Sequence, residues 1–252
     1  MTEDSRPDRS ATEDPVPRPL FDPESVPVVG LARGPALPLD VLTPAALRAA
    51  FASPRPWQPE ASDEARKPVL RKGASGPVPA SVLMPIVVRD SGLAMLLTER
   101  TAHLTDHAGQ VSFPGGGAEP ADADAVATAL RETEEEIGLA REHVEVLGRL
   151  PDYPTVTGFI VAPVVGLVHP PFELTLYDYE VAEAFEVPLA YLMDPANQRM
   201  HEVSTPQGTR RFLSMPYDGH FTWGATAWML RNLYVFLRTQ LLLTPSASRP
   251  PP

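Results

Sequence analysis

Residues 109–139 form the most informative stretch of the chain and read G-Q-V-S-F-P-G-G-G-A-E-P-A-D-A-D-A-V-A-T-A-L-R-E-T-E-E-E-I-G-L. The first residues alternate between apolar and polar, which predicts a short strand, and a glycine turn follows at residues 114–117. Residues 121–137 have the apolar spacing of a helix, which ends beside Gly138, a residue typical of helix C-caps. The stretch therefore predicts a strand, a glycine loop and an amphipathic helix in direct succession.

Acidic side chains crowd the last turns of this predicted helix. Glu132, Glu135 and Glu136 are spaced so that their carboxylates lie on one helical face and repel one another. Acidic residues are also unfavourable at a helix C-terminus, where the macrodipole is negative. A hard divalent cation such as Mg²⁺ would relieve both effects, because it prefers oxygen ligands. A solvated acidic face is the alternative, but the glycine loop favours a ligand, since it allows close approach of the backbone.

The rest of the chain alternates between apolar runs typical of strands and segments with helical spacing. No regular strand–helix–strand repeat is present in the sequence, which favours an α+β fold or a mixed-sheet sandwich. Pro85 lies inside one apolar run, where it indicates a local break or an edge position. Thr43 and Pro44 are suited to begin a short helix, as N-cap and first helical residue. Strands are predicted at residues 82–88, 93–99, 143–150, 159–168, 181–187 and 210–215, and helices at 41–52, 189–193 and 222–242.

Proline marks the expected domain organisation. The chain has 31 prolines among 252 residues, and 15 of them lie in the first 80. Residues 1–38 are rich in Pro, Asp, Glu and Arg without periodicity, which predicts a disordered or weakly attached tail. We therefore expect a Pro-rich, largely disordered N-terminal extension with a short helix near residues 43–52. The expected limits are 1–75 for this extension, 76–243 for the folded domain and 244–252 for a disordered C-terminal tail.

Composition argues against several functional classes. The formal net charge is −11, which is unfavourable for a nucleic-acid binder that relies on a broad basic surface. The chain has no cysteine, so disulfides, thiolate zinc sites and cysteine nucleophiles are excluded. The N-terminus lacks the basic and apolar regions of a signal peptide, and no apolar run reaches the length of a membrane span. We therefore expect a cytoplasmic protein that binds neither nucleic acid nor membrane.

The glycine loop and the helix after it resemble a known motif, the Nudix box, G-x5-E-x7-R-E-U-x-E-E-x-G-U. Two positions depart from it: the first glutamate falls on Ala123, and the apolar residue after Arg-Glu is Thr133. The chain is thus identified as a member of the Nudix family, which implies an α+β fold, a Nudix-type α/β/α sandwich with a mixed β-sheet. The residues that match the box are Gly117, Arg131, Glu132, Glu135, Glu136, Gly138 and Leu139.

A second motif resembles one branch of that family, the coenzyme A pyrophosphatases. Residues 96–101 and 109–116 are similar to L-L-T-x-R-S-x3-R-x3-G-x-V-x-F-P-G-G, an element that precedes the box in this branch. The internal basic position of the element falls on Thr105. Shorter matches to the same branch follow further along the chain, at residues 154–159, 163–166 and 221–227.

The resemblance implies a metal-dependent pyrophosphohydrolase that uses Mg²⁺ or Mn²⁺. Its small-molecule substrate would be coenzyme A or acyl-coenzyme A, cleaved to 4′-phosphopantetheine, or its acyl form, and adenosine 3′,5′-bisphosphate. Thr105 keeps another nucleoside diphosphate derivative open as substrate: ADP-ribose, NADH or a dinucleotide polyphosphate. A non-catalytic Nudix-fold sensor is a third hypothesis, which the intact glutamates disfavour. The assembly state is left open, with a homodimer as one candidate.

The resemblance also implies roles for individual residues. Arg131 is expected to orient a glutamate, and a carboxylate from outside the box is expected to act as a further ligand or as general base. Glu180 is the best match for that carboxylate, and Glu183 is the alternative. The expected catalytic residues are Glu132, Glu135, Glu136, Arg131 and Glu180, and the expected metal ligands are these four glutamates and Gly116.

A further set of residues is expected to bind the substrate. Arg100 is the motif-matched candidate for a phosphate contact. Phe113, Tyr153 and Trp223 could stack on adenine, and ordinary core packing is the alternative for each ring. The expected substrate-binding residues are Arg100, Gly109, Phe113, Gly115, Gly116 and Tyr153.

Overall fold

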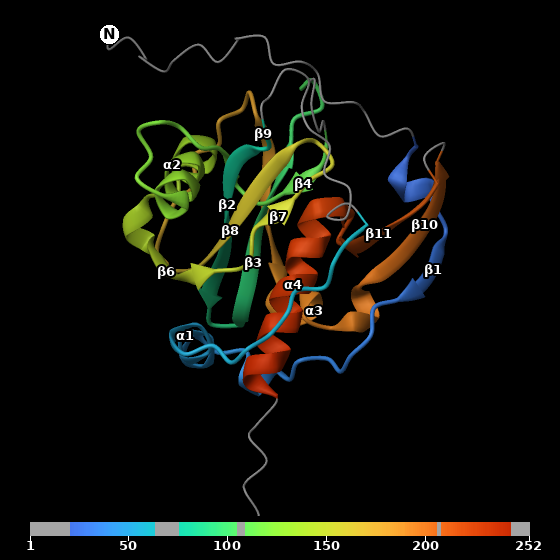
Figure 1. The fold of residues 1–252 in the computed structure, drawn as a ribbon. Coiled ribbons are helices and arrows are strands. Elements are labelled where there is room, and N and C mark those ends of the chain that lie inside the picture. The colour runs from blue at the N-terminus through green and yellow to red at the C-terminus, as the bar shows by residue number, and fades with distance from the viewer. Residues whose placement is uncertain (1–20, 64–75, 105–108, 206–207, 243–252) are drawn as a thin grey trace, which may run out of the picture.

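The computed structural model describes residues 21–63, 76–104, 109–205 and 208–242 (Figure 1). Thr105, the first 20 residues and the predicted C-terminal tail lie outside the described residues. None of the described helices is both long and apolar enough to span a membrane. The helices are α1 (Pro44–Ala52), α2 (Ala125–Ile137), α3 (Leu189–Leu192) and α4 (Gly224–Leu241), with 3₁₀ turns at Pro23–Ser25, Leu39–Val41, Arg141–His143 and Pro195–Asn197.

The larger of two β-sheets contains eight strands. Its main path runs β4-β3-β2-β8-β6, while β5 pairs with β2, β7 with β8 and β9 with β3. Strands β2 and β8 are parallel and the other pairs are antiparallel, so the sheet is mixed, as predicted. Its strands are β2 (Val78–Arg89), β3 (Gly92–Arg100), β4 (Val111–Ser112), β5 (Gly115–Gly117), β6 (Val144–Arg149), β7 (Tyr153–Pro154), β8 (Phe159–Val168) and β9 (Val181–Pro188).

The smaller sheet is antiparallel, with the strand order β1-β10-β11-β12. The sequence predicts only β11 of these strands. The inward position of β10 is occupied by His201, a polar residue whose ring bonds the Ser214 hydroxyl and the Val26 carbonyl, so an apolar alternation is missing there. The strands are β1 (Val28–Leu31), β10 (Arg199–Thr205), β11 (Gly208–Tyr217) and β12 (His220–Trp223).

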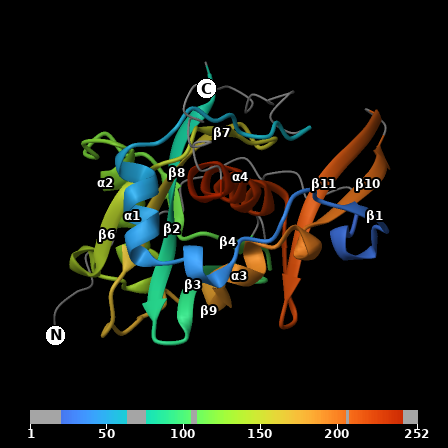
Figure 2. The same ribbon diagram turned by 90° about the horizontal axis from the view of Figure 1, so that it is seen from below.

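Helices cover both faces of the larger sheet. Helix α2 packs against β2, β5 and β8 on one face. Helix α4 lies on the opposite face, between the two sheets (Figure 2). Met84 and Ile86 of β2 belong to the same buried apolar core as Leu230 and Leu233 of α4. The predicted α/β/α sandwich is therefore confirmed.

Residues 21–63 pack against this sandwich, which corrects the expectation of a disordered or weakly attached tail for residues 21–38 and of a largely disordered extension beyond them; the short helix expected near residues 43–52 is present as α1. Strand β1 pairs with β10, and Leu37 is buried in the apolar core. Arg231 of α4 is 3% exposed and donates to the Glu60 carboxylate (2.7 Å) and the Arg33 carbonyl (2.9 Å). The attachment depends on contacts far apart in the sequence, so a local pattern could not reveal it.

Two local details also differ from the prediction. Helix α2 begins at Ala125 rather than at residue 121, because Asp124 caps it by accepting the N–H groups of Val126 and Ala127. Pro85 lies in the interior strand β2 rather than at an edge, but at a local break, the other predicted alternative. On one side of β2 it falls between the residues that pair with β5 and those that pair with β3, so its missing N–H interrupts neither of these two ladders; on the other side it is in register with Gly166 of β8.

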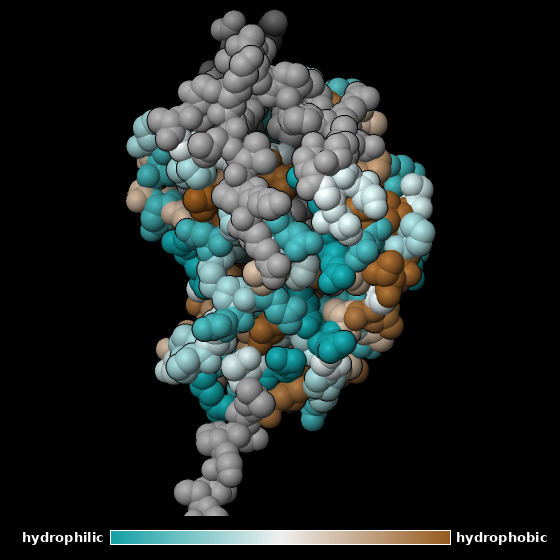
Figure 3. All heavy atoms as spheres, turned by 45° about the vertical axis from the view of Figure 1, so that its right-hand side comes forward, coloured by the Kyte–Doolittle hydropathy of each residue, from teal (hydrophilic) through white to brown (hydrophobic). Residues whose placement is uncertain are grey.

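The described surface mixes apolar and hydrophilic residues. On the face shown in Figure 3, apolar residues form patches separated by hydrophilic ones. Exposed apolar side chains include Val28, Val29 and Leu31 of the edge strand β1.

Candidate functional site

The glycine strand β5 and the acidic end of α2 are in contact in the structure. The sequence places Glu132 and Glu136 on a face of α2 separate from its apolar stripe, yet their exposed fractions are only 3% and 6%. They are buried because β5 lies against this part of the helix. A Cβ atom on Gly116 would lie 2.7 Å from the Glu132 carboxylate carbon, and one on Gly115 would lie 2.3 Å from the Ser81 carbonyl oxygen. Position 115 therefore requires glycine, because the clash is with backbone, whereas a side chain at 116 would displace the Glu132 carboxylate.

Glu136 has few groups that compensate its burial. The Gly115 N–H donates to Glu136 Oε2 (2.9 Å), and Arg100 Nη1 lies 3.8 Å from Oε1. Burial nevertheless raises the pKa of Glu136 to about 8, and the nearby charges of Glu180 and Glu132 act in the same direction. A carboxylate in such a position gains much from a cation, since charge neutralisation offsets the desolvation.

Arg131 connects the acidic residues to the glycine strand. Its guanidinium donates to both carboxylate oxygens of Asp122 (2.9 Å each), to Glu132 Oε1 (3.0 Å) and to Glu135 Oε2 (3.2 Å). It also donates to the Gly117 carbonyl (3.1 Å). These bonds hold the carboxylates on this face of α2 in fixed orientations.

Asp122 is the residue of this site that the sequence analysis missed. Its bidentate bond with Arg131 holds the pKa of Asp122 well below the usual range, and it also accepts bonds from Glu119 N–H and the Thr128 hydroxyl. The available signal was an acidic residue beside Ala123, the position at which the motif has glutamate. A neighbouring carboxylate in the loop therefore bonds the arginine of the motif.

The structure separates the two alternatives for the extra carboxylate. Glu180 Oε2 lies 4.0 Å from Arg100 Nη1, the guanidinium nitrogen that also faces Glu136. The Glu180 carbonyl accepts the Thr101 N–H, which holds the loop before β9 beside the end of β3. Glu183 instead lies beside His220, whose Nε2 is 3.2 Å from Glu183 Oε2. The structure therefore groups Glu180, and not Glu183, with the buried glutamates.

Arg100 and Gly109 lie at the entrance to β4. The Gly109 N–H donates to the Arg100 carbonyl (3.1 Å), and Gly109 has a left-handed φ of 68°, so it closes the turn through its backbone. The Arg100 Nε atom is buried and has no hydrogen-bond partner among the described residues. The guanidinium is thus held near the glutamates with one donor unsatisfied, which suits it to an anionic ligand.

The aromatic candidates lie elsewhere. Phe113 and Tyr153 are 2% and 4% exposed and belong to the apolar core, and the Tyr153 hydroxyl donates to the Ser62 hydroxyl (2.8 Å). Trp223 packs edge-on against Phe212. Neither Phe113 nor Tyr153 can stack on a base while the core is closed, so core packing, the alternative interpretation, describes both rings.

Comparison with known proteins agrees with the motif. The NUDIX domain family model matches residues 79–203. The chain is 42% identical over 154 residues to a protein of Escherichia coli (strain K12) named "Uncharacterized Nudix hydrolase NudL", a match that covers 61% of this chain and 80% of the relative. The protein of the same name from Salmonella paratyphi B gives the same identity and coverage. A solved Nudix hydrolase from M. smegmatis, RenU, is 22% identical, with a TM-score of 0.40 over 48% of this chain and 78% of that one.

Proposed function

The chain belongs to the Nudix family of hydrolases, and we propose that it is a metal-dependent pyrophosphohydrolase of coenzyme A or acyl-coenzyme A. The reaction is hydrolysis of the diphosphate, which yields 4′-phosphopantetheine, or its acyl form, and adenosine 3′,5′-bisphosphate. One observation carries the catalytic part of the proposal. Two carboxylates, Glu132 and Glu136, are buried side by side on α2 under a glycine strand, and burial raises the pKa of Glu136.

The residues present fit a divalent cation. The donor set consists of carboxylate oxygens from Glu132, Glu135 and Glu136, which are the ligands that Mg²⁺ and Mn²⁺ prefer. The space beside Glu132 would be filled by any side chain at Gly116, so the backbone can approach the same position. When bound, Mg²⁺ or Mn²⁺ neutralises the diphosphate and lowers the pKa of a bound water.

The remaining roles fall to residues around these glutamates. Arg131 holds Glu132 and Glu135 in fixed orientations through the bonds described above. Arg100, whose Nε has no hydrogen-bond partner among the described residues, offers its guanidinium to a phosphate oxygen of the substrate. Glu180, beside Arg100, accepts a proton from the attacking water as general base.

The choice of coenzyme A rests on the second motif. The motif forms the end of β3, the turn at Gly109 and the strands β4 and β5, and it therefore includes both Arg100 and the glycine strand. Thr105, its departing position, lies outside the described residues. ADP-ribose, NADH and dinucleotide polyphosphates are the competing substrates, and a non-catalytic sensor is the competing class.

A substrate panel tests both parts of the proposal. The purified full chain is incubated with Mg²⁺ or Mn²⁺ and coenzyme A, acetyl-coenzyme A, NADH, ADP-ribose or diadenosine polyphosphate, and the products are separated by chromatography. We expect coenzyme A or its acyl form to be cleaved fastest. Efficient cleavage of another compound without coenzyme A turnover would refute the substrate, and no hydrolysis in the panel would favour the sensor.

A pair of variants on α2 tests the site itself. Glu136→Gln removes the charge of a proposed ligand with little change of shape, and we expect kcat to fall at least about a hundredfold. Glu134→Gln is the matched control, because Glu134 lies on the same helix but is bonded to Arg141. Near-normal activity of Glu136→Gln, or equal losses in both variants, would refute the placement of the site.

The limits of the catalytic unit are part of the proposal. We place the hydrolase domain at residues 76–243, with the segment 21–63 packed on it as described.

A homodimer is the proposed assembly, and sedimentation of the full chain tests it: a monomer at micromolar concentration would refute it.

A further inference from the structure

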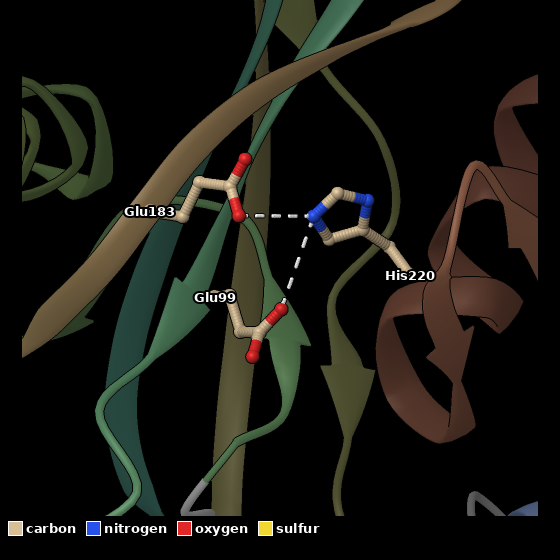
Figure 4. A group of neighbouring side chains, drawn as sticks. All are labelled: Glu99, Glu183 and His220. Atoms are coloured by element: carbon tan, nitrogen blue, oxygen red, sulfur yellow. Dashed lines mark hydrogen bonds and ion pairs between the residues drawn. The ribbon is translucent and has the colours of Figure 1, made fainter.

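A second group of metal-binding side chains lies away from α2. Glu99 of β3, Glu183 of β9 and His220 of β12 point toward one another (Figure 4). The Nε2 atom of His220 is 3.2 Å from Glu183 Oε2 and 3.9 Å from Glu99 Oε2. The three potential ligand atoms all lie within 4.8 Å of one another. Ligands at about 2.1 Å from a zinc ion in a tetrahedral site are roughly 3.4 Å apart, so small side-chain adjustments would complete the geometry.

This group lies on the other face of the larger sheet from the proposed catalytic site. Successive side chains of a strand point to opposite faces, and Glu99 immediately precedes Arg100, whose guanidinium faces Glu136. Phe185, two residues after Glu183, belongs with the apolar residues on the α4 side of the sheet. The two groups are therefore separated by the sheet itself.

The two glutamates repel each other unless a cation is present. Glu99 and Glu183 are direct cross-strand partners in the β3–β9 ladder, an arrangement in which like charges are destabilising. In the part of the chain that the structure describes, the ion-pair partner recorded for each of them is His220, and no Lys or Arg pairs with either.

His220 is held in a fixed orientation. Its ring stacks on that of Phe185, with centroids 3.6 Å apart and an angle of 12° between the planes. Nε2 faces the carboxylates, whereas Nδ1 is buried on the other side of the ring and has no hydrogen-bond partner among the described residues. The side chains of Glu99 and Glu183 are 35% and 54% exposed, so ions and water can reach the carboxylates.

We propose that Glu99, Glu183 and His220 form a second divalent-cation site, distinct from the Nudix glutamates. One imidazole nitrogen and two carboxylate oxygens are a donor set suited to Zn²⁺, with water as the remaining ligand. Mg²⁺ is a poor fit, because it prefers oxygen ligands alone. Since β12 belongs to the smaller sheet and the glutamates to the larger one, the bound ion joins the two sheets.

Calorimetric titration of the full chain with Zn²⁺, in excess Mg²⁺ to occupy the Nudix glutamates, tests the proposal. We expect wild type to bind one Zn²⁺ that Glu183→Gln and His220→Gln bind about tenfold more weakly or not at all. Glu186→Gln is the matched control, because Glu186 is a glutamate of the same strand that pairs with Arg89 instead. Glu136→Gln should keep the Zn²⁺, which separates this site from the proposed hydrolase function.

Thermal unfolding supplies a readout that does not depend on calorimetry. A cation that binds the folded state raises Tm, so Zn²⁺ should raise the Tm of wild type and Glu186→Gln but not of Glu183→Gln. A single cooperative unfolding transition of each protein in EDTA establishes that the variants fold. If wild type binds no Zn²⁺, or if Glu183→Gln and His220→Gln bind it like wild type, the three residues form only an ion pair and the proposal is overturned.

Discussion

Replacement of Gly116 by alanine tests whether the glycine strand sets the position of a catalytic carboxylate. The added Cβ would lie 2.7 Å from the Glu132 carboxylate carbon, whereas ordinary contacts begin at 3.4 Å. The carboxylate must therefore retreat by about 0.7 Å, or the strand must shift by the same distance. Arg131 holds Glu132 by a 3.0 Å bond, so the displacement also disturbs the guanidinium network.

The expected effect of this substitution is large on catalysis and modest on stability. Displacement of a reacting group by about 1 Å can reduce the rate about a hundredfold, so we expect a loss of that order in kcat/KM. The colliding atoms belong to the end of a flexible side chain, so the free energy of unfolding should fall by only about 1–2 kcal/mol. Steady-state kinetics and urea unfolding measure the two quantities.

Gly117→Ala is the matched control for Gly116→Ala. A Cβ at Gly117 meets no atom within 4 Å in the described part of the chain, and the Gly117 backbone does not adopt a left-handed φ. The carbonyl that accepts from Arg131 is kept in alanine. We therefore expect nearly normal stability and a much smaller loss of activity. Equal losses in the two variants would refute the argument that contact with Glu132 is what requires glycine at 116.

Three further predictions concern charge. In EDTA, Glu136 has a pKa of about 8 in the folded protein and near 4.5 in the unfolded chain, so the free energy of unfolding should fall as the pH rises from 4.5 to 8. Urea unfolding at a series of pH values should show a weaker pH dependence of this free energy for Glu136→Gln. Arg131→Lys keeps the charge but loses the bidentate bond to Asp122, and we expect kcat to fall roughly tenfold with little change in KM; unchanged kcat would contradict an orienting role. Arg231→Ala leaves the buried Gln198 amide oxygen and the Arg33 carbonyl without their donor, so urea unfolding should show a loss of about 2–3 kcal/mol, and a loss below 1 kcal/mol would contradict the anchoring role of this arginine.

Local spacing predicts the part of the site that lies on one helix. Glu132, Glu135, Glu136 and Arg131 are close in sequence, and the helical period alone brings them to one face. Asp122 lies outside the helix, and its bond to Arg131 depends on how the loop folds back, which periodicity does not encode. The glutamates at the helix end are also buried by β5, a contact made by tertiary packing rather than by the helix.

Long-range contacts account for what the sequence leaves unpredicted. Glu99, Glu183 and His220 are far apart in the chain and meet only because two strands pair and a third comes from the other sheet. The attachment of residues 21–63 likewise depends on Arg231. From the sequence, Arg231 is only a charged residue within an apolar helix, and its partners cannot be predicted. Neither contact follows from local propensity, because both are set by the packing of whole elements.

The start of β9 has an irregularity in its pairing with β3, between the two groups of carboxylates. The β3–β9 ladder pairs Glu99 with Glu183 but then Arg100 with Val181, so Ala182 is an extra residue without a partner. Bulges of this kind redirect a strand, and they are common beside active sites. In the sequence, Val181 and Ala182 are two adjacent apolar residues at the bulge, a break in alternation too short to identify it. Val181 pairs with Arg100, and the Glu180 carboxylate just before β9 lies 4.0 Å from the Arg100 guanidinium, while Glu183 stays opposite Glu99. The bulge therefore lies where the chain passes from one group of carboxylates to the other.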